Sequence, residues 1–331
     1  MPATLDDVAR HAGVSRSAAS RAINDRPGVK PDVRARVLAA AEQLGFRPNR
    51  SARSLASGRS SVIGLVIPTA DLRVDPYGAA LTHAVGRAAA HRDLALVLQI
   101  ADERPGRTVQ HILADGLLDG LLISAVAVGP AWVDELIDAP LPSVLIGAHP
   151  SRTGLTDVTV ESVESSSAAV THLFAAGCTR VGIITGPPGR VDAAERLTGY
   201  RLAHQRAGRT VDEHLIVPGD YTRPSGLTGA ALLVDRGADG IFASNDEMAV
   251  AAMWTITHRG LNVPRDVKVA GFDGSAIGEM IEPSLTSVVQ PFDGLASAAV
   301  GLLEAAIGGD TAPARVRLEP TLVIGGSTTT T

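Results

Sequence analysis

Apolar residues in the first part of the chain recur every three or four positions, which is the spacing of amphipathic helices. Small side chains such as Ala19 and Ala22 fall on one side of this pattern. Thr4, Ser15 and Pro31 belong to residue types that favour the start of a helix. The pattern therefore predicts three short helices, over residues 5–12, 15–24 and 31–44.

Beyond residue 60 the pattern changes to short apolar runs that alternate with amphipathic stretches. Such runs are typical of buried parallel strands, and the stretches between them are typical of helices that cover a sheet. The predicted strands cover residues 61–68, 94–101, 120–124, 142–147, 180–186, 240–245, 267–274 and 286–290. Residues 119–124 resemble residues 239–244, which indicates two related halves. We expect a small all-α head followed by an α/β body of two doubly wound parallel-sheet lobes.

Charge is distributed unevenly along the 331 residues, whose formal net charge is -5. Residues 1–60 contain 11 Lys and Arg against 5 Asp and Glu, and the rest of the chain contains 19 against 30. A basic segment on an acidic body indicates a module that binds a polyanion, attached to a body that binds something else.

The helical pattern of the first segment, with a glycine-containing turn after the first helix, is typical of a helix-turn-helix. Arg16, Ser17, Ser20 and Arg21 share the outward face of the second helix, where side chains can reach base edges in the major groove. The alternative is a solvated basic face on an ordinary three-helix domain. Residues 49–60 carry three arginines and one leucine, Leu55, and read either as a flexible basic linker or as a helix that forms on DNA.

Several classes of protein lack their signals in this sequence. No apolar run is long enough to span a membrane, and the first residues do not form a secretory signal, so we expect a cytoplasmic protein without a membrane partner. Cys178 is the only cysteine, and we expect an inert thiol. The prolines in Gly186–Gly189 make a phosphate-binding loop a poor interpretation. We expect no enzyme activity, catalytic residue, metal or cofactor; the alternative is a small-molecule kinase fused to a DNA-binding head.

Polar side chains stand where predicted strands end, which in doubly wound folds is where ligands bind. Asn245, Asp273 and Gln290 end strands, and Tyr77 and Arg196 lie early in helices that follow strands. Carboxylate, guanidinium and carboxamide groups suit a ligand rich in hydroxyls, and an aromatic face suits its apolar side. Each residue also has a structural interpretation, and we expect the neighbouring Asp246 to cap the helix that follows it.

Residues 4–24 (TLDDVARHAGVSRSAASRAIN) and 48–58 (PNRSARSLASG) resemble the head and hinge of the LacI family (LacI/GalR type) of bacterial transcription regulators. The similarity continues to about Thr328 and implies a body like periplasmic binding proteins. It implies a homodimer that binds a palindromic operator, with Arg16, Ser17 and Arg21 in the major groove and Ala52 and Leu55 in the minor groove. The DNA-binding set it suggests comprises Thr4, Ser15, Arg16, Ser17, Ser20, Arg21, Asn24, Asn49, Ala52, Arg53 and Leu55.

The same resemblance implies a ligand in the cleft between the lobes, whose binding changes the affinity for DNA. The ligand-binding set is Tyr77, Gly147, Arg196, Tyr221, Asn245, Asp273, Gln290 and Phe292. Gly147 stands where an acidic residue is common in the family, which implies that the wall there is less polar or roomier. A sugar is favoured as the small-molecule effector, and a purine or nucleoside is the alternative.

The expected domain organisation follows from these patterns. Residues 1–47 form the helix-turn-helix domain, 48–60 the hinge helix or linker, and 61–331 the effector-binding and dimerisation domain. Within the last, we expect residues 61–161 and 291–324 in the N-terminal lobe, and 162–290 with the C-terminal strand in the other.

Overall fold

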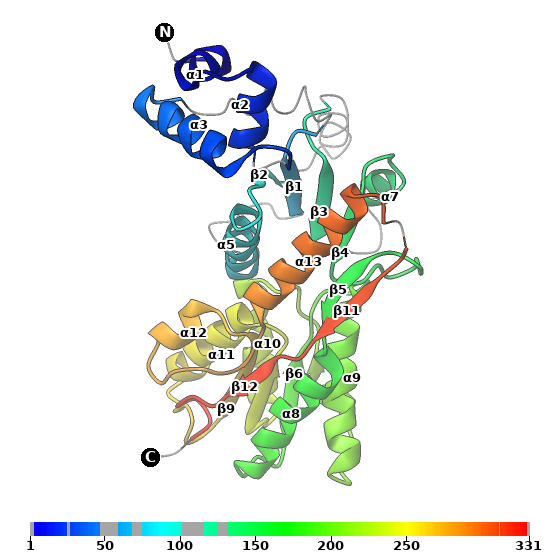
Figure 1. Ribbon diagram of the computed structural model, residues 1–331. Coiled ribbons are helices and arrows are strands. Elements are labelled where there is room, and N and C mark those ends of the chain that lie inside the picture. The colour runs from blue at the N-terminus through cyan, green and yellow to red at the C-terminus, as the bar shows by residue number, and fades with distance from the viewer. Residues whose placement is uncertain are drawn as a thin grey trace. The chain divides into compact units, whose positions relative to one another are not determined.

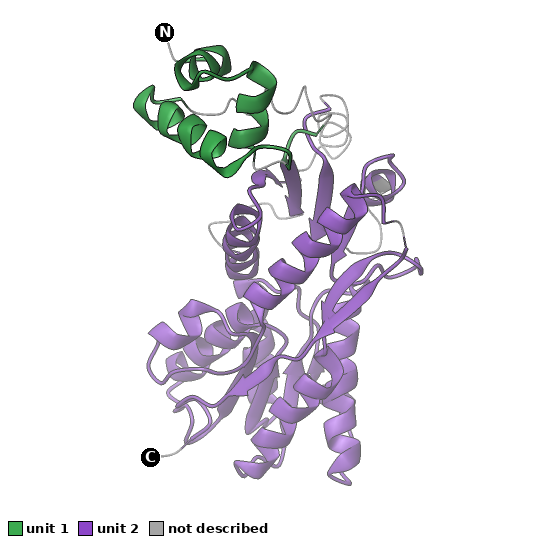
Figure 2. Cartoon of the chain, viewed as in Figure 1, with its two compact units in different colours: residues 1–61 green, residues 62–331 purple. Residues whose placement is uncertain are grey.

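The computed structural model describes residues 3–24, 27–46, 59–67, 75–100, 116–124, 131–310 and 312–329. The chain divides into two compact units, residues 1–61 and 62–331, which Figure 2 draws in different colours. Each unit has its own hydrophobic core.

The described part of the first unit is a three-helix domain made of α1 (Leu5–Ala12), α2 (Arg16–Ile23) and α3 (Pro31–Gln43). A capping box between Thr4 and Asp7 starts α1, and the Ser15 side chain caps α2 by accepting from the Ala18 amide. The helices bury a core that includes Val8, Ala19, Ala22, Val37 and Ala40. The predicted helices are confirmed, and the small alanines allow the helices to approach closely.

The described residues of the second unit form two six-stranded sheets, so the predicted fold class is confirmed. The first sheet has the order β11-β5-β4-β3-β1-β2 and the second has the order β12-β10-β9-β8-β6-β7. Pairing is parallel throughout, except between β10 and β12. The strands are β1 (Val62–Ile67), β2 (Ala95–Ile100), β3 (Gly120–Ser124), β4 (Ser143–Ile146), β5 (Asp157–Val160), β6 (Val181–Ile184), β7 (Ile216–Val217), β8 (Gly240–Ala243), β9 (Lys268–Asp273), β10 (Thr286–Val289), β11 (Arg315–Leu318) and β12 (Thr321–Val323).

Helices cover both faces of each sheet, as Figure 1 shows. In the first lobe α5 and α13 pack on one face and α7 packs on the other, and in the second lobe α8 and α9 lie opposite α10 and α11. The helices are α5 (Pro76–Ala90), α7 (Ala131–Ile137), α8 (Ser162–Ala175), α9 (Val191–Arg206), α10 (Arg223–Asp235), α11 (Asp246–His258), α12 (Ala276–Met280) and α13 (Phe292–Ile307), with a 3-10 turn, η2, at Glu213–Leu215.

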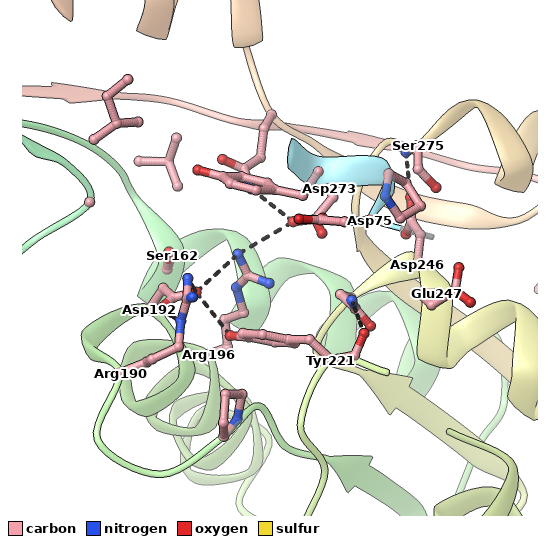
Figure 3. A pocket seen from close by; sticks show the side chains of 18 of the residues that line it. Asp75, Ser162, Arg190, Asp192, Arg196, Tyr221, Asp246, Glu247, Asp273 and Ser275 are labelled. Atoms are coloured by element: carbon pink, nitrogen blue, oxygen red, sulfur yellow. Dashed lines mark hydrogen bonds and ion pairs between the residues drawn. The ribbon is translucent and has the colours of Figure 1, made fainter. Parts of the chain in front are cut away.

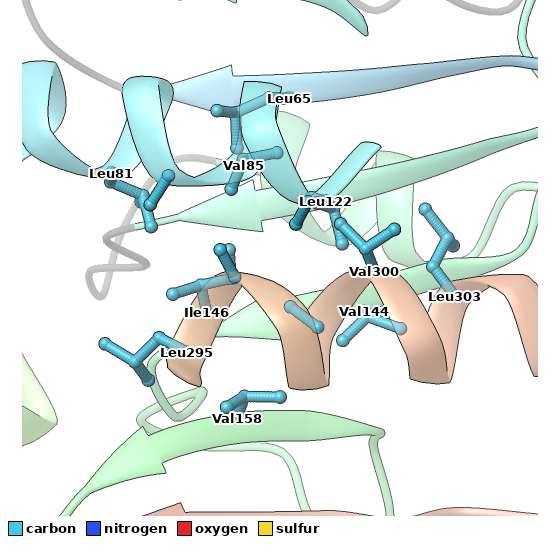
Figure 4. Close-up of a cluster of buried hydrophobic side chains, with 14 of the residues drawn as sticks. Leu65, Leu81, Val85, Leu122, Val144, Ile146, Val158, Leu295, Val300 and Leu303 are labelled. Atoms are coloured by element: carbon cyan, nitrogen blue, oxygen red, sulfur yellow. The ribbon is translucent and has the colours of Figure 1, made fainter. Parts of the chain in front are cut away.

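The core of the first lobe combines segments that are far apart in the sequence. Figure 4 shows Leu81 and Val85 of α5, Leu122 of β3, and Val300 and Leu303 of α13 as members of one cluster of buried side chains. These side chains are fully or almost fully buried, which favours folding by the hydrophobic effect. Helix α13 follows the second lobe in sequence but packs in the core of the first lobe. The first lobe is therefore built from two separate segments of the chain.

The chain passes between the two sheets at residues 160–162, 289–292 and 318–321. The third crossing places β12, the C-terminal strand, in the second sheet, so the segment of the first lobe ends at β11 and does not reach residue 324. The reason is that β12 pairs with β10, with Leu322 opposite Val288. The crossings leave the carboxyl ends of both sets of parallel strands facing a common space.

Candidate functional site

A cavity of about 680 Å³ is lined by residues of both lobes, mostly at or just beyond the carboxyl ends of strands (Figure 3). Its wall contains most of the ligand-binding set suggested by the sequence, namely Tyr77, Gly147, Arg196, Tyr221, Asn245, Asp273 and Gln290. Phe292 lies behind this wall and packs edge-on against Tyr77, with ring centres 5.5 Å apart. Phe292 therefore supports the aromatic wall without forming it.

Arg196 of α9 is the most enclosed cation of the pocket, with 3% of its surface exposed. Its Nη1 donates to the carbonyl oxygen of Ser244, and its Nη2 lies 3.4 Å from Oδ1 of Asp273. The guanidinium also lies over the Phe272 ring, 3.8 Å from its centre. These contacts fix the position of a planar hydrogen-bond donor in the cavity wall.

Asp273, the last residue of β9, supplies the matching carboxylate. Oδ1 accepts a hydrogen bond of 2.7 Å from Nε2 of Gln290. Burial raises the pKa of Asp273 to about 6, although the Arg196 cation opposes this shift. The backbone of Asp273 has a φ of 113°, a conformation that residues other than glycine rarely adopt.

A second ion pair in the wall comes from residues that the sequence analysis did not select. Arg190 donates to both oxygens of Asp192, at 2.9 and 3.1 Å, and Oη of Tyr221 donates to Oδ2 of Asp192 at 3.0 Å. Burial alone would raise the pKa of Asp192, but Arg190 and Arg196 lower it to about 2. The only sequence signal was an Arg-x-Asp at a helix start, which is also common on solvated surfaces.

The pocket therefore pairs its inner charges. Asp192 offsets Arg190, and Asp273 offsets Arg196, which also lies 3.9 Å from Asp192. The guanidinium carbons of both arginines lie over the Tyr221 ring, 5.3 and 5.4 Å from its centre. Such a site offers many hydrogen-bonding groups with little net charge from these four residues.

The helix cap beside the pocket differs from the expectation. Asn245, and not Asp246, caps α11, because its Oδ1 accepts from the amide of Met248 at 3.0 Å. Its Nδ2 donates to the carbonyl oxygen of Tyr221. Asp246 is 1% exposed and accepts from the Ser275 amide and the Ser287 hydroxyl, both at 2.6 Å. Burial, helped by the Asp273 charge, raises the pKa of Asp246 to about 7.

In the first unit, the candidate DNA-reading side chains gather around α2. Arg16, Ser17 and Arg21 are exposed, and Arg21 donates to Oγ of Ser17 at 3.0 Å. Arg16 lies 3.3 Å from Asp6 of α1. Thr4, Ser15 and Asn24 are exposed at the ends of the helices, and Ser20 is half-buried. The suggested hinge contacts Asn49, Ala52, Arg53 and Leu55 lie outside the described residues.

Other classes of site lack support in the described part of the chain. Within the described ranges, no cluster of three or more His, Cys, Asp or Glu side chains could hold a metal ion. Among those same residues, no helix is long and apolar enough to cross a bilayer. The Cys178 thiol is buried, and burial raises its pKa to about 11, which disfavours the reactive thiolate.

Comparisons with known proteins cover both units. Residues 4–49 match the family described as bacterial regulatory proteins, lacI family, and residues 170–328 match the periplasmic binding protein-like domain. The HTH-type transcriptional regulator CelR of Thermobifida fusca is 34% identical over 334 residues, 97% of this chain and 97% of that protein. A solved CelR–cellobiose complex has a TM-score of 0.77 and 32% identity, covering 98% of this chain and 99% of that one. The lac repressor dimer bound to operator and the anti-inducer ONPF has a TM-score of 0.80 and 25% identity, covering 99% of both chains.

Proposed function

The chain belongs to the LacI family of DNA-binding transcriptional regulators and is not an enzyme, and on that premise we propose that it is a sugar-responsive repressor. It binds a palindromic operator as a homodimer in the cytoplasm, and a neutral sugar in the cleft changes its affinity for that operator. The choice of a neutral ligand rests on one observation: Arg190 and Arg196 in the pocket are already paired with carboxylates.

The proposed DNA contact is the exposed face of α2. Arg16 and Arg21 offer guanidinium groups that can bind guanine in the major groove, and Ser17 can donate to or accept from several bases. The remaining exposed polar residues around α2 suit contacts to phosphates, which orient a protein on DNA without reading its sequence.

The pocket chemistry supports an uncharged polyol over an anionic ligand. A sugar phosphate would add a dianion to a site whose two inner cations, Arg190 and Arg196, are already paired with carboxylates, so part of its charge would lose hydration without compensation. Hydroxyl groups can accept from Arg196 and Gln290 and donate to Asp273. The cavity volume equals the share of about 23 water molecules in liquid water, at roughly 30 Å³ each. A disaccharide such as the cellobiose of the CelR complex fits such a space.

Exposed apolar side chains on the second lobe support the proposed homodimer. Trp254 on α11 is 46% exposed, and Ile277 and Met280 on the neighbouring α12 are 38% and 84% exposed. Exposed apolar side chains that gather into a patch are characteristic of protein interfaces, so these three residues are our candidates for the dimer contact. We expect Met280→Glu with Trp254→Ala to shift the protein from dimer to monomer in analytical ultracentrifugation. A variant that stays dimeric would place the interface elsewhere.

The ligand class is tested by thermal unfolding with a panel of mono- and disaccharides, sugar phosphates and nucleobases. A ligand that binds only the folded state stabilises it by about 2.7 kcal/mol at a hundredfold excess over its dissociation constant. We expect a hit among the neutral sugars that is lost in Asp273→Asn. Asp266→Asn is the matched control, since the Asp266 side chain binds Asn262 and Arg265 at the surface of the same lobe. A hit among sugar phosphates or nucleobases alone would refute the neutral sugar.

A further inference from the structure

We propose that Asp246 and Ser287 form a clamp that positions Asp273 for the ligand. The clamp fixes the backbone of residues 273–275, and this backbone sets the position of the Asp273 side chain. The inference rests on the proposed function only in taking the cavity as the ligand site. Asp246 acts here as a positioning residue, since it works through Asp273.

The clamp consists of three hydrogen bonds, two of which come from consecutive backbone amides, those of Gly274 and Ser275. Oδ2 of Asp246 accepts from the Ser275 amide at 2.6 Å, and Oδ1 accepts from the Ser287 hydroxyl at 2.6 Å. Oγ of Ser287 in turn accepts from the Gly274 amide at 3.2 Å. The start of α11, strand β10 and the turn after β9 are thus joined through one carboxylate, part of which Figure 3 shows.

The turn needs such a clamp because its backbone is unfavourable by itself. Asp273 has a φ of 113°, and Gly274 follows at 71°. A residue other than glycine stays in this region only when surrounding contacts fix it. With the backbone so fixed, Asp273 meets Arg196 on one side and Gln290 on the other.

The neighbouring sequence leaves room for the carboxylate. Gly271 lies inside β9, where glycine weakens a strand, and a Cβ there would lie 2.3 Å from Oδ1 of Asp246. Capping of α11 does not explain why residue 246 is an aspartate, because the capping hydrogen bond is made by the side chain of Asn245. Support of the turn at Asp273 therefore explains both the buried carboxylate of Asp246 and the glycine at position 271 in the strand.

Ser287→Ala is the most direct test, because Ser287 is not among the described residues that line the cavity. The change removes the hydroxyl between Gly274 and Asp246 and leaves the pocket wall intact. Releasing one residue's backbone corresponds to about tenfold in affinity. We expect ligand binding to weaken by about that factor in Ser287→Ala, and by more in Asp246→Ala. Because both residues act through one clamp, the two changes should not be independent. In the double variant, ligand affinity should fall by less than the product of the two single-variant factors.

Two further variants separate positioning from general destabilisation. Asp239→Ala removes a comparable anchor in the same lobe, which accepts from the amides of Thr179 and Arg180. It should lower the melting temperature but leave the ligand dissociation constant within about twofold. Asp246→Asn keeps an acceptor for the Ser275 amide and a donor for Oγ of Ser287, so it should restore most of the affinity lost in Asp246→Ala.

The experiment is calorimetric titration of the full chain with cellobiose, glucose and adenine. Tenfold weaker binding in Ser287→Ala, with Asp239→Ala unchanged, supports the clamp; equal weakening in both, or none in Ser287→Ala, overturns it. If none of the three probes binds the wild-type protein, the proposed ligand class is refuted. Amide hydrogen exchange then tests separately whether the clamp fixes the backbone of the turn. Slow exchange at Gly274 and Ser275 that becomes fast in Asp246→Ala supports it, and equal exchange in both proteins overturns it.

Discussion

Adding one methyl group at Gly186 should disturb the pocket directly. A Cβ at residue 186 would lie 2.3 Å from Cζ and 2.5 Å from Oη of Tyr221, closer than side chains can pack. The ring must move, and its hydrogen bond of 3.0 Å to Asp192 must break. A hydrogen bond to a charged group contributes about 1.5–3 kcal/mol, and each cation–π contact about 0.5–1 kcal/mol. Since Arg190 and Arg196 both lie over this ring, we expect Gly186→Ala to lower the free energy of unfolding by about 3 kcal/mol.

Urea unfolding followed by circular dichroism measures this change. Gly86→Ala is the matched control, because Gly86 lies within α5 and a Cβ there meets only Leu96, at 3.9 Å. Alanine inside a helix should stabilise the protein by about 0.5–1 kcal/mol relative to glycine. Gly186→Ala should also weaken ligand binding, whereas the control should not. A Gly186→Ala protein as stable as the wild type would refute the close packing of Tyr221 on this loop.

Two other changes test the electrostatics of the lobes and the DNA contact. The folded-state pKa of Asp246 is raised to about 7, so its contribution to stability is fully present below about pH 4 and is lost as the pH rises through 7. Asp246→Asn removes this titration. The free energy of unfolding of the wild type relative to the variant should therefore fall by up to about 4 kcal/mol between pH 4 and pH 8. If urea unfolding gives the same difference between the two proteins at both pH values, the prediction is contradicted. Arg16→Ala should weaken binding to a selected operator by about 1–3 kcal/mol and relax its sequence preference. Equal losses on operator and scrambled DNA in fluorescence anisotropy would exclude base reading by Arg16.

Among the described residues, hydrophobic periodicity predicted eight of the twelve strands and missed β5, β7, β11 and β12. Strand β11 is exposed at alternate positions and carries Arg315 and Arg317, so it lacks an apolar run. Its place in the sheet comes from pairing with β5, where Arg315 binds Asp157 at 2.7 Å. Strand β7 has two residues, too few for any pattern. Such strands depend on contacts that local sequence does not encode.

The pocket was predictable where topology alone decides the position. Residues that end parallel strands, such as Asp273 and Gln290, reach the cavity because those ends face it. Asp192 was missed because its partner Tyr221 is 29 residues away in sequence. The role of Asp246 was assigned wrongly, because helix capping depends on which of two adjacent polar residues lies outside the first turn.

In the mechanism proposed above, occupancy of the cleft changes the affinity for DNA. The measurement that tests it most directly is fluorescence anisotropy of a selected palindromic operator, titrated with the protein at constant salt, with and without the sugar found by thermal unfolding. We expect the operator dissociation constant to change by about 5- to 150-fold at saturating sugar, the usual range of coupling between sites. Asp273→Asn should bind the operator as the wild type does and show no response to the sugar. An operator affinity that is the same with and without saturating sugar would contradict the claim.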